Sequence, residues 1–140
     1  MNPLVRLPPL DIQKTLEFPI PIAMFDRYAK RNNTFRKGVW QLMLELKKFL
    51  FLVASFQRED QGRRFSPPPA RDPLWHHFIS DDTELYRDFC SDCFSLFIHH
   101  RAGATYPRHE LTRRAAKLGI VLNPSVWSEL QTDERDPECG

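Results

Sequence analysis

The chain has 140 residues, of which 41% are hydrophobic and 27% charged, the size and composition of one ordinary globular domain. Its formal net charge of +2 is too small to indicate nucleic-acid binding by itself. The longest apolar run, residues 49–54, is far too short to cross a bilayer. Three cysteines, and prolines where a signal peptide needs an apolar helix, predict a reduced cytoplasmic protein with no membrane partner.

The first 21 residues contain five prolines, which remove backbone donors and disfavour helix. We therefore expect an extended arm over residues 1–21, with one short turn near residues 11–18. A short helix should follow over residues 22–31, ended by a pair of asparagines. Thr34 is the expected N-cap of a long helix that continues to about Gln57.

The long helix carries two apolar stripes. The broader stripe has helical spacing and comprises Val39, Leu42, Met43, Leu46, Phe49, Leu50, Val53 and Phe56. A second stripe, formed by Trp40, Leu44 and Phe51, is separated from the first by Lys47. A helix with two apolar faces either lies at the centre of its own domain or is partly covered by another chain. The second stripe is therefore a candidate partner-binding surface, and self-association is the simplest form of that binding.

Polar and then proline-rich residues over 58–71 predict a surface loop. Asp72 and Pro73 mark the start of a short helix that ends near Ser80. The residues from Asp81 to Thr83 should cap a longer helix over 83–100, with His100 facing the core and His99 facing water.

A basic helix is expected over residues 108–118, stopped by Gly119, and a last helical turn around Val126 and Trp127. The polar residues 131–140 predict a flexible tail. Together these elements predict a single all-α domain of about five helices over residues 22–130, preceded by the extended proline-rich arm.

The stretch from Asp72 to His100 holds four of the five histidines and two of the three cysteines. Thiolate and imidazole groups are the ligands that zinc prefers, so this stretch is a candidate metal site. Its candidate ligands are His76, His77, Cys90, Cys93 and His100. On one continuous helix Cys93 and His100 would be about 10.5 Å apart, so His100 would need a different partner from the cysteines. The alternative is that both cysteines are buried apolar residues and the histidines form hydrogen bonds between helices.

A cysteine and a nearby histidine could also act as nucleophile and base, with Asp81 or Asp82 orienting the imidazole. No surrounding signature of a thiol enzyme and no glycine-rich phosphate loop accompanies them. We therefore expect no catalytic residues and no enzymatic activity, and no cofactor other than zinc.

The C-terminal part offers a nucleic-acid-binding alternative. Its candidate residues are Arg101, Arg108, Arg113, Arg114 and Lys117, around one helix in which Ala115 and Gly119 have a spacing found in helix-turn-helix units. Pro124 and a short second helix fit that unit poorly, and a solvated basic face is the more common explanation of such a cluster.

The segment from the first histidine pair to the second contains a motif that is similar to one found in a known family. Its elements are Trp75, His76, Phe78, Ile79, Thr83, Tyr86, Phe89, Cys90, Ile98, His99 and His100, with an upstream segment over residues 45–50. At these positions the chain resembles a family of small bacterial proteins related to the glycine-rich domain-containing-protein-like family. Two differences are Ser95, where glycine is common, and one extra residue between Trp75 and Thr83.

The resemblance implies a helical domain and leaves its biochemical role open. With the small size and the doubly apolar helix, it leads us to expect a non-catalytic protein-interaction domain. The expected role is that of an accessory or inhibitory factor from a bacterium or a mobile element.

Overall fold

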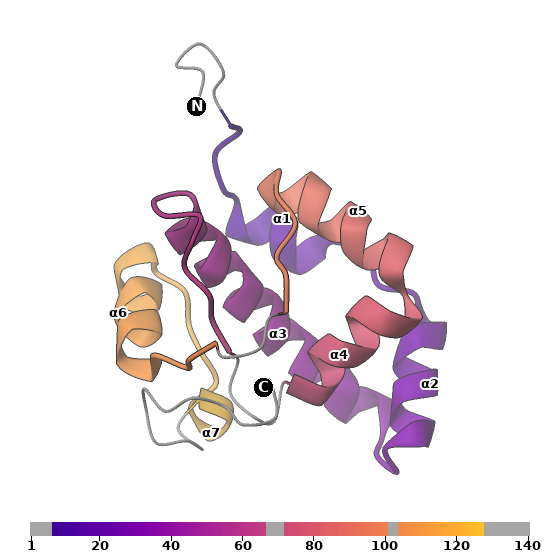
Figure 1. Ribbon diagram of the computed structural model, residues 1–140. Coiled ribbons are helices and arrows are strands. Elements are labelled where there is room, and N and C mark those ends of the chain that lie inside the picture. Colours follow the sequence, from indigo (N-terminus) through magenta and orange to yellow (C-terminus); the bar gives the residue numbers. More distant parts are fainter. Residues whose placement is uncertain (1–6, 67–71, 101–103, 128–140) are drawn as a thin grey trace.

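The computed structural model describes residues 7–66, 72–100 and 104–127 (Figure 1). Within these ranges the predicted all-α class is confirmed, because the chain forms seven helices and no strand beyond an isolated bridge between Phe65 and Thr105. The helices are α1 (Ile12–Glu17), α2 (Ile22–Arg31), α3 (Arg36–Gln57), α4 (Asp72–Asp81), α5 (Thr83–Phe94), α6 (Arg108–Leu118) and α7 (Pro124–Trp127). No helix in the described ranges has the length and apolar character needed to span a membrane.

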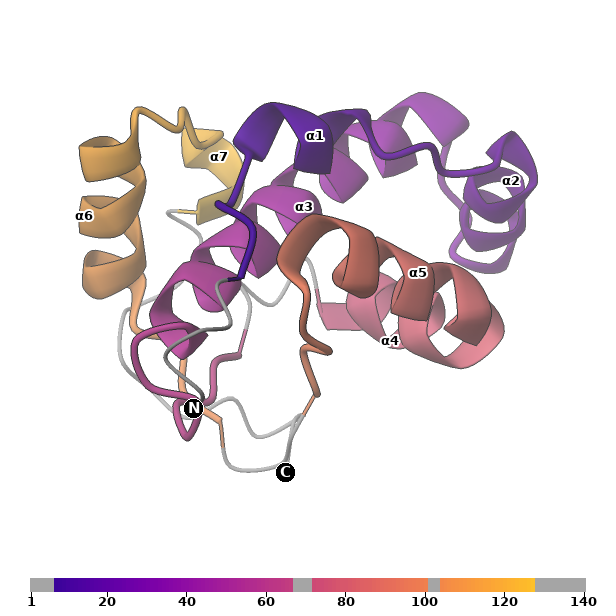
Figure 2. The same cartoon turned by 90° about the horizontal axis from the view of Figure 1, so that it is seen from above.

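Helix α3 is the central element of the fold. It contacts α1, α2, α4 and α6, and most of its side chains from Val39 to Phe56 are buried. In both ribbon views α6 and α7 lie on one side of α3, and α2, α4 and α5 lie on the other (Figures 1 and 2). The two apolar stripes of this helix are therefore largely the consequence of its central position.

Two charged residues of α3 are buried and hold distant segments in place. The Oε1 atom of Glu45 accepts hydrogen bonds from the Asn123 backbone N–H and the Trp127 indole N–H, both at 2.9 Å. The Nζ atom of Lys47 donates to the backbone carbonyls of Leu16 at 2.9 Å and Phe18 at 2.6 Å. Because buried charges must be paired or hydrogen-bonded, these contacts attach both ends of the described chain to α3.

Helix α1 lies within the segment predicted as an extended arm, where only a short turn was expected. Asp11 caps its N-terminus by accepting hydrogen bonds from the backbone N–H groups of Gln13 and Lys14. The side chain of Thr15 is fully buried. Residues 11–18 are thus part of the packed domain, whereas residues 1–6 and the predicted tail over 131–140 lie outside the described residues.

The predicted helices over 22–31 and 108–118 are confirmed, and Gly119 ends α6 in the left-handed conformation with φ of 74°. Two predicted caps are wrong. Phe35 rather than Thr34 occupies the N-cap position of α3, and it forms no side-chain cap. Asp82 at the start of α5 also forms no cap bond, because its carboxylate pairs with Arg27 instead.

The prediction that one helix extends from residue 83 to His100 is wrong beyond Phe94. Ser95 has φ of 59° and ψ of 28°, a left-handed conformation in which the helix ends. This backbone favours glycine, and glycine is the residue that the resemblance led us to expect at this position. Residues 95–100 then run as an irregular segment without helix.

Candidate functional site

A buried chain of hydrogen bonds links three residues of the motif in the Asp72–His100 stretch. The indole N–H of Trp75 donates to the Tyr86 hydroxyl at 3.0 Å, and that hydroxyl donates to the Ile98 backbone carbonyl at 2.6 Å. All three residues are buried. They join α4, α5 and the irregular segment, so the motif's tryptophan, tyrosine and isoleucine belong to the core.

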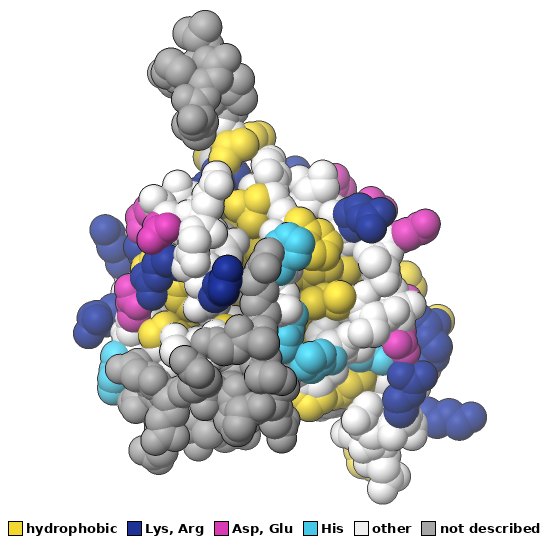
Figure 3. All heavy atoms as spheres, in the orientation of Figure 1, with side chains coloured by type: hydrophobic (Ala, Val, Ile, Leu, Met, Phe, Trp, Pro, Cys, Tyr) yellow, Lys and Arg dark blue, Asp and Glu magenta, His cyan; other side chains and the backbone are white. Residues whose placement is uncertain are grey.

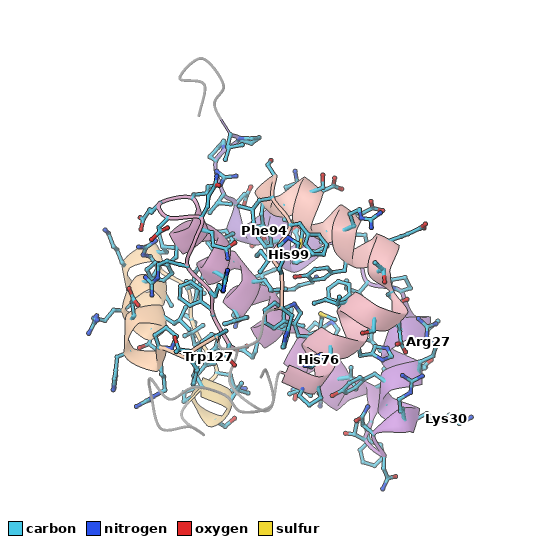
Figure 4. The ribbon with its side chains drawn as sticks, viewed as in Figure 1. Arg27, Lys30, His76, Phe94, His99 and Trp127 are labelled. Atoms are coloured by element: carbon cyan, nitrogen blue, oxygen red, sulfur yellow. The ribbon has the colours of Figure 1, made fainter. Side chains whose placement is uncertain are left out.

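Two of the predicted metal ligands come together at the edge of this core. The rings of His76 and His100 have centroids 4.0 Å apart, and His100 lies 4.4 Å from the Trp75 ring. His99 is exposed and His100 half-buried, as expected, although neither belongs to a helix. Histidine side chains gather on this face beside an apolar surface (Figure 3), and His76 and His99 mark its position on α4 and on the irregular segment (Figure 4).

His77 points elsewhere, into a charged network between α2 and the junction of α4 and α5. Its Nδ1 atom lies 3.2 Å from the Asp81 carboxylate, and its Nε2 atom lies 3.9 Å from the Asp82 carboxylate. Arg31 pairs with Asp81 at 2.6 Å, and Arg27 pairs with Asp82 at 2.7 Å. Burial lowers the pKa of His77, an effect larger than the opposing one of the two carboxylates. A neutral, buried imidazole in this position links helices.

The two described cysteines have different surroundings. Burial raises the pKa of Cys90 to about 11, although contacts with the Tyr86 hydroxyl and the Ile98 backbone partly oppose the rise. Burial also raises the pKa of Cys93, which hydrogen-bonds with Thr15 under α1. Raised thiol pKa values disfavour the thiolate that both metal binding and nucleophilic attack require.

The five predicted metal ligands therefore do not form one site. Among the residues that the structure describes, no group of three or more histidine, cysteine, aspartate or glutamate side chains is placed to hold a metal ion. The 10.5 Å separation expected along a helix does not apply to Cys93 and His100, because α5 ends between them. Cys139 lies outside the described residues.

The predicted nucleic-acid-binding residues are only partly available on α6. The Arg114 guanidinium lies over the Phe56 ring, 3.8 Å from its centroid, and donates to Glu59 at 2.8 Å. Arg113 and Lys117 are exposed and Arg108 is half-buried, whereas Arg101 lies outside the described residues. The second element of the expected helix-turn-helix, α7, has buried Val126 and Trp127 side chains. This packing leaves α7 poorly placed to enter a groove of DNA.

The predicted partner-binding stripe is divided by the fold. Phe51 is buried, with its ring centroid 6.5 Å from that of Phe94 on α5, and Leu44 is half-buried. Trp40 remains 51% exposed. Only the N-terminal end of the stripe is therefore available to another molecule.

An apolar groove lies beside Trp40, between the start of α2 and the start of α3. It has a volume of about 470 Å³ and is lined by Ile20, Ile22, Phe25, Arg36, Lys37 and Trp40. We call it the α2–α3 groove. Ile22 is 58% exposed at this groove, and Phe35, directly before α3, is 83% exposed.

Ile22 and Phe35 were not among the predicted partner-binding residues. Their spacing gave no signal of exposure, because Ile22 is in helical register with the buried Phe25, and Phe35 with the buried Val39.

Comparison of the chain with protein-family models, with curated proteins and with solved structures found no match in any of the three. The fold and the surface features together define an all-α domain built around one buried helix.

Proposed function

We propose that this chain is a non-catalytic protein-binding domain and that the α2–α3 groove is its binding surface. The observation that carries this proposal is the exposure of Trp40 on the lining of the groove, at 51%, and of Phe35 directly before α3, at 83%. Every other aromatic side chain of the described residues, histidines apart, is buried or half-buried. Exposed aromatic residues beside a groove are typical anchors of protein–protein contacts.

The size of the apolar surface favours a short segment of another protein over a second copy of this chain. Aromatic side chains present roughly 150–250 Å² each, so the exposed parts of Phe35 and Trp40 amount to roughly 300 Å². A stable dimer buries about 800 Å² on each partner. The groove is thus suited to a peptide segment with a few apolar anchors.

The zinc and nucleic-acid alternatives have less support. The predicted zinc ligands are divided among separate surroundings, and the Arg114 side chain of the basic helix is engaged with Phe56 and Glu59.

Selection of binders from a display library of random helical peptides tests the proposal. Most selected peptides should bind the folded chain and lose binding to a Trp40→Ser variant. Val121→Ser is the matched control, because Val121 is 81% exposed and lies outside the groove lining. Selected peptides that bind Trp40→Ser as tightly as the unmodified chain, with both folded by circular dichroism, would contradict the proposal.

Light scattering separates the two kinds of occupant. We expect a monomer at high protein concentration, because the apolar surface is small. A dimer that dissociates on the Trp40→Ser substitution would show that the groove binds a second copy of this chain and not a segment of another protein.

A further inference from the structure

Positive charge is concentrated around the α2–α3 groove. Residues 22–40 contain five basic residues and one acidic residue, whereas the formal net charge of the whole chain is only +2. The two charged residues that line the groove, Arg36 and Lys37, are both basic, and such a lining favours a negatively charged ligand.

Three of these basic residues are paired within the chain. Arg27 pairs with Asp82, and Arg31 pairs with Asp81. Arg36 forms a bidentate ion pair with Asp26, with N–O distances of 2.7 and 3.0 Å. Lys30 and Lys37 have no ion-pair partner among the described residues.

The two lysines are placed for contact with another molecule. Lys30 extends from α2 away from the body of the protein (Figure 4), and Lys37 lines the groove itself. The Lys37 ammonium group is therefore available to a partner that enters beside Trp40, whereas Lys30 lies at the other end of α2 from Ile22.

The start of α3 strengthens the positive potential. The N-terminal end of a helix carries a partial positive charge, which acidic residues in the first turn normally offset. The first turn of α3 contains Arg36 and Lys37 and no acidic residue, and its N-cap forms no side-chain hydrogen bond. This arrangement is unfavourable for an isolated helix, and a negatively charged partner would relieve it.

We propose that the segment bound by the α2–α3 groove is an acidic amphipathic helix. Its apolar side chains would contact Ile22 and Trp40, and its carboxylates would face Lys37 and the N-terminal end of α3. A helix is favoured over an extended strand because no sheet edge for strand addition exists among the described residues. This inference rests on the proposed function and specifies its partner.

Two synthetic helical peptides with the same apolar face provide the test, one with glutamates and one with lysines on the polar face. Trp40 is the natural reporter of binding, because the other two tryptophans, Trp75 and Trp127, are buried. The acidic peptide should shift the Trp40 fluorescence and bind roughly tenfold or more tightly than the basic peptide, with an affinity that falls as salt is added.

Charge reversal provides the matched pair of variants. Lys37→Glu should weaken the acidic peptide and strengthen the basic one. Lys117→Glu introduces the same change on the exposed surface of α6 and should leave both affinities unchanged. Equal effects of the two substitutions would show that net charge, and not the groove, determines binding, and would overturn the inference.

The remaining outcomes separate this inference from the proposed function. If both peptides bind equally and Trp40→Ser abolishes both, the groove is a binding surface and the acidic partner is wrong. If neither peptide binds, the proposed function fails together with the inference. If neither binds and vesicles of anionic lipid bind in a manner that Phe35→Ser abolishes, a membrane surface replaces the protein partner.

Discussion

Replacing Tyr86 with phenylalanine removes one oxygen atom from the centre of the domain and leaves the aromatic ring in place. That oxygen accepts a hydrogen bond from the Trp75 indole at 3.0 Å and donates one to the Ile98 carbonyl at 2.6 Å. Because all three residues are buried, neither the Trp75 N–H nor the Ile98 carbonyl can form a replacement hydrogen bond with bulk water.

The expected cost follows from these two contacts. A buried hydrogen bond contributes about 1 kcal/mol net, and a buried donor or acceptor left without a partner costs about 1–3 kcal/mol. The substitution strands one donor and one acceptor, so we expect the free energy of unfolding to fall by about 2–6 kcal/mol. This loss is large compared with the roughly 5–15 kcal/mol that stabilises an ordinary domain.

Urea unfolding followed by circular dichroism measures the loss. In a double-mutant cycle with Trp75→Phe the two costs should not add, because both substitutions remove the same indole–hydroxyl bond. Hydrogen exchange should also become faster over residues 96–100, which the Tyr86–Ile98 bond attaches to α5. A loss below about 0.5 kcal/mol, typical of a surface substitution, would refute the reasoning.

Three further predictions concern backbone strain and buried charge. Ser95→Gly should raise the free energy of unfolding by about 0.5–1 kcal/mol, because glycine adopts the left-handed conformation at φ of 59° without steric cost; a urea series in which the midpoint falls would contradict this. Burial lowers the pKa of Lys47 to about 8 from 10.5, so the unfolded chain binds more protons between these pH values and the unmodified protein should gain stability over this range relative to Lys47→Met. Parallel stability curves for the two proteins would exclude this effect. Because the pKa of His77 is lowered from 6.5, stability should fall as the pH drops below about 6.5, and His77→Gln should remove that part of the dependence; an NMR titration in which the His77 ring protonates at or above pH 6.5 would show that the sign is wrong.

The sequence alone predicts those elements whose signals are local. The limits of α2 follow from an apolar pattern that ends at two asparagines, and the limits of α6 follow from a pattern that ends at Gly119. The length of α3 follows from 22 residues of helical periodicity without proline. Such signals act within one turn of helix, so they do not depend on the rest of the fold.

The end of α5 depends on tertiary contacts. The apolar pattern of that helix continues to residue 100, with no proline or glycine to stop it. The chain nevertheless leaves the helix at Ser95, because Tyr86 then bonds to Ile98 and His100 packs on Trp75. These contacts outweigh the few tenths of a kcal/mol by which helix propensities differ. For this reason the sequence placed one predicted metal ligand, His100, on a continuation of α5 that the structure does not have.

The apolar pattern of the sequence likewise predicted only part of the candidate binding surface. Trp40 and Phe51 belong to the same predicted stripe of α3, and nothing in their spacing distinguishes them. Helix α5 covers Phe51, with Phe94 against it, whereas Trp40 has no such cover and stays half-exposed. The sequence by itself determined which face of α3 is apolar, because periodicity is local. Only the tertiary structure decided which part of that face is buried, because burial depends on where the other helices end.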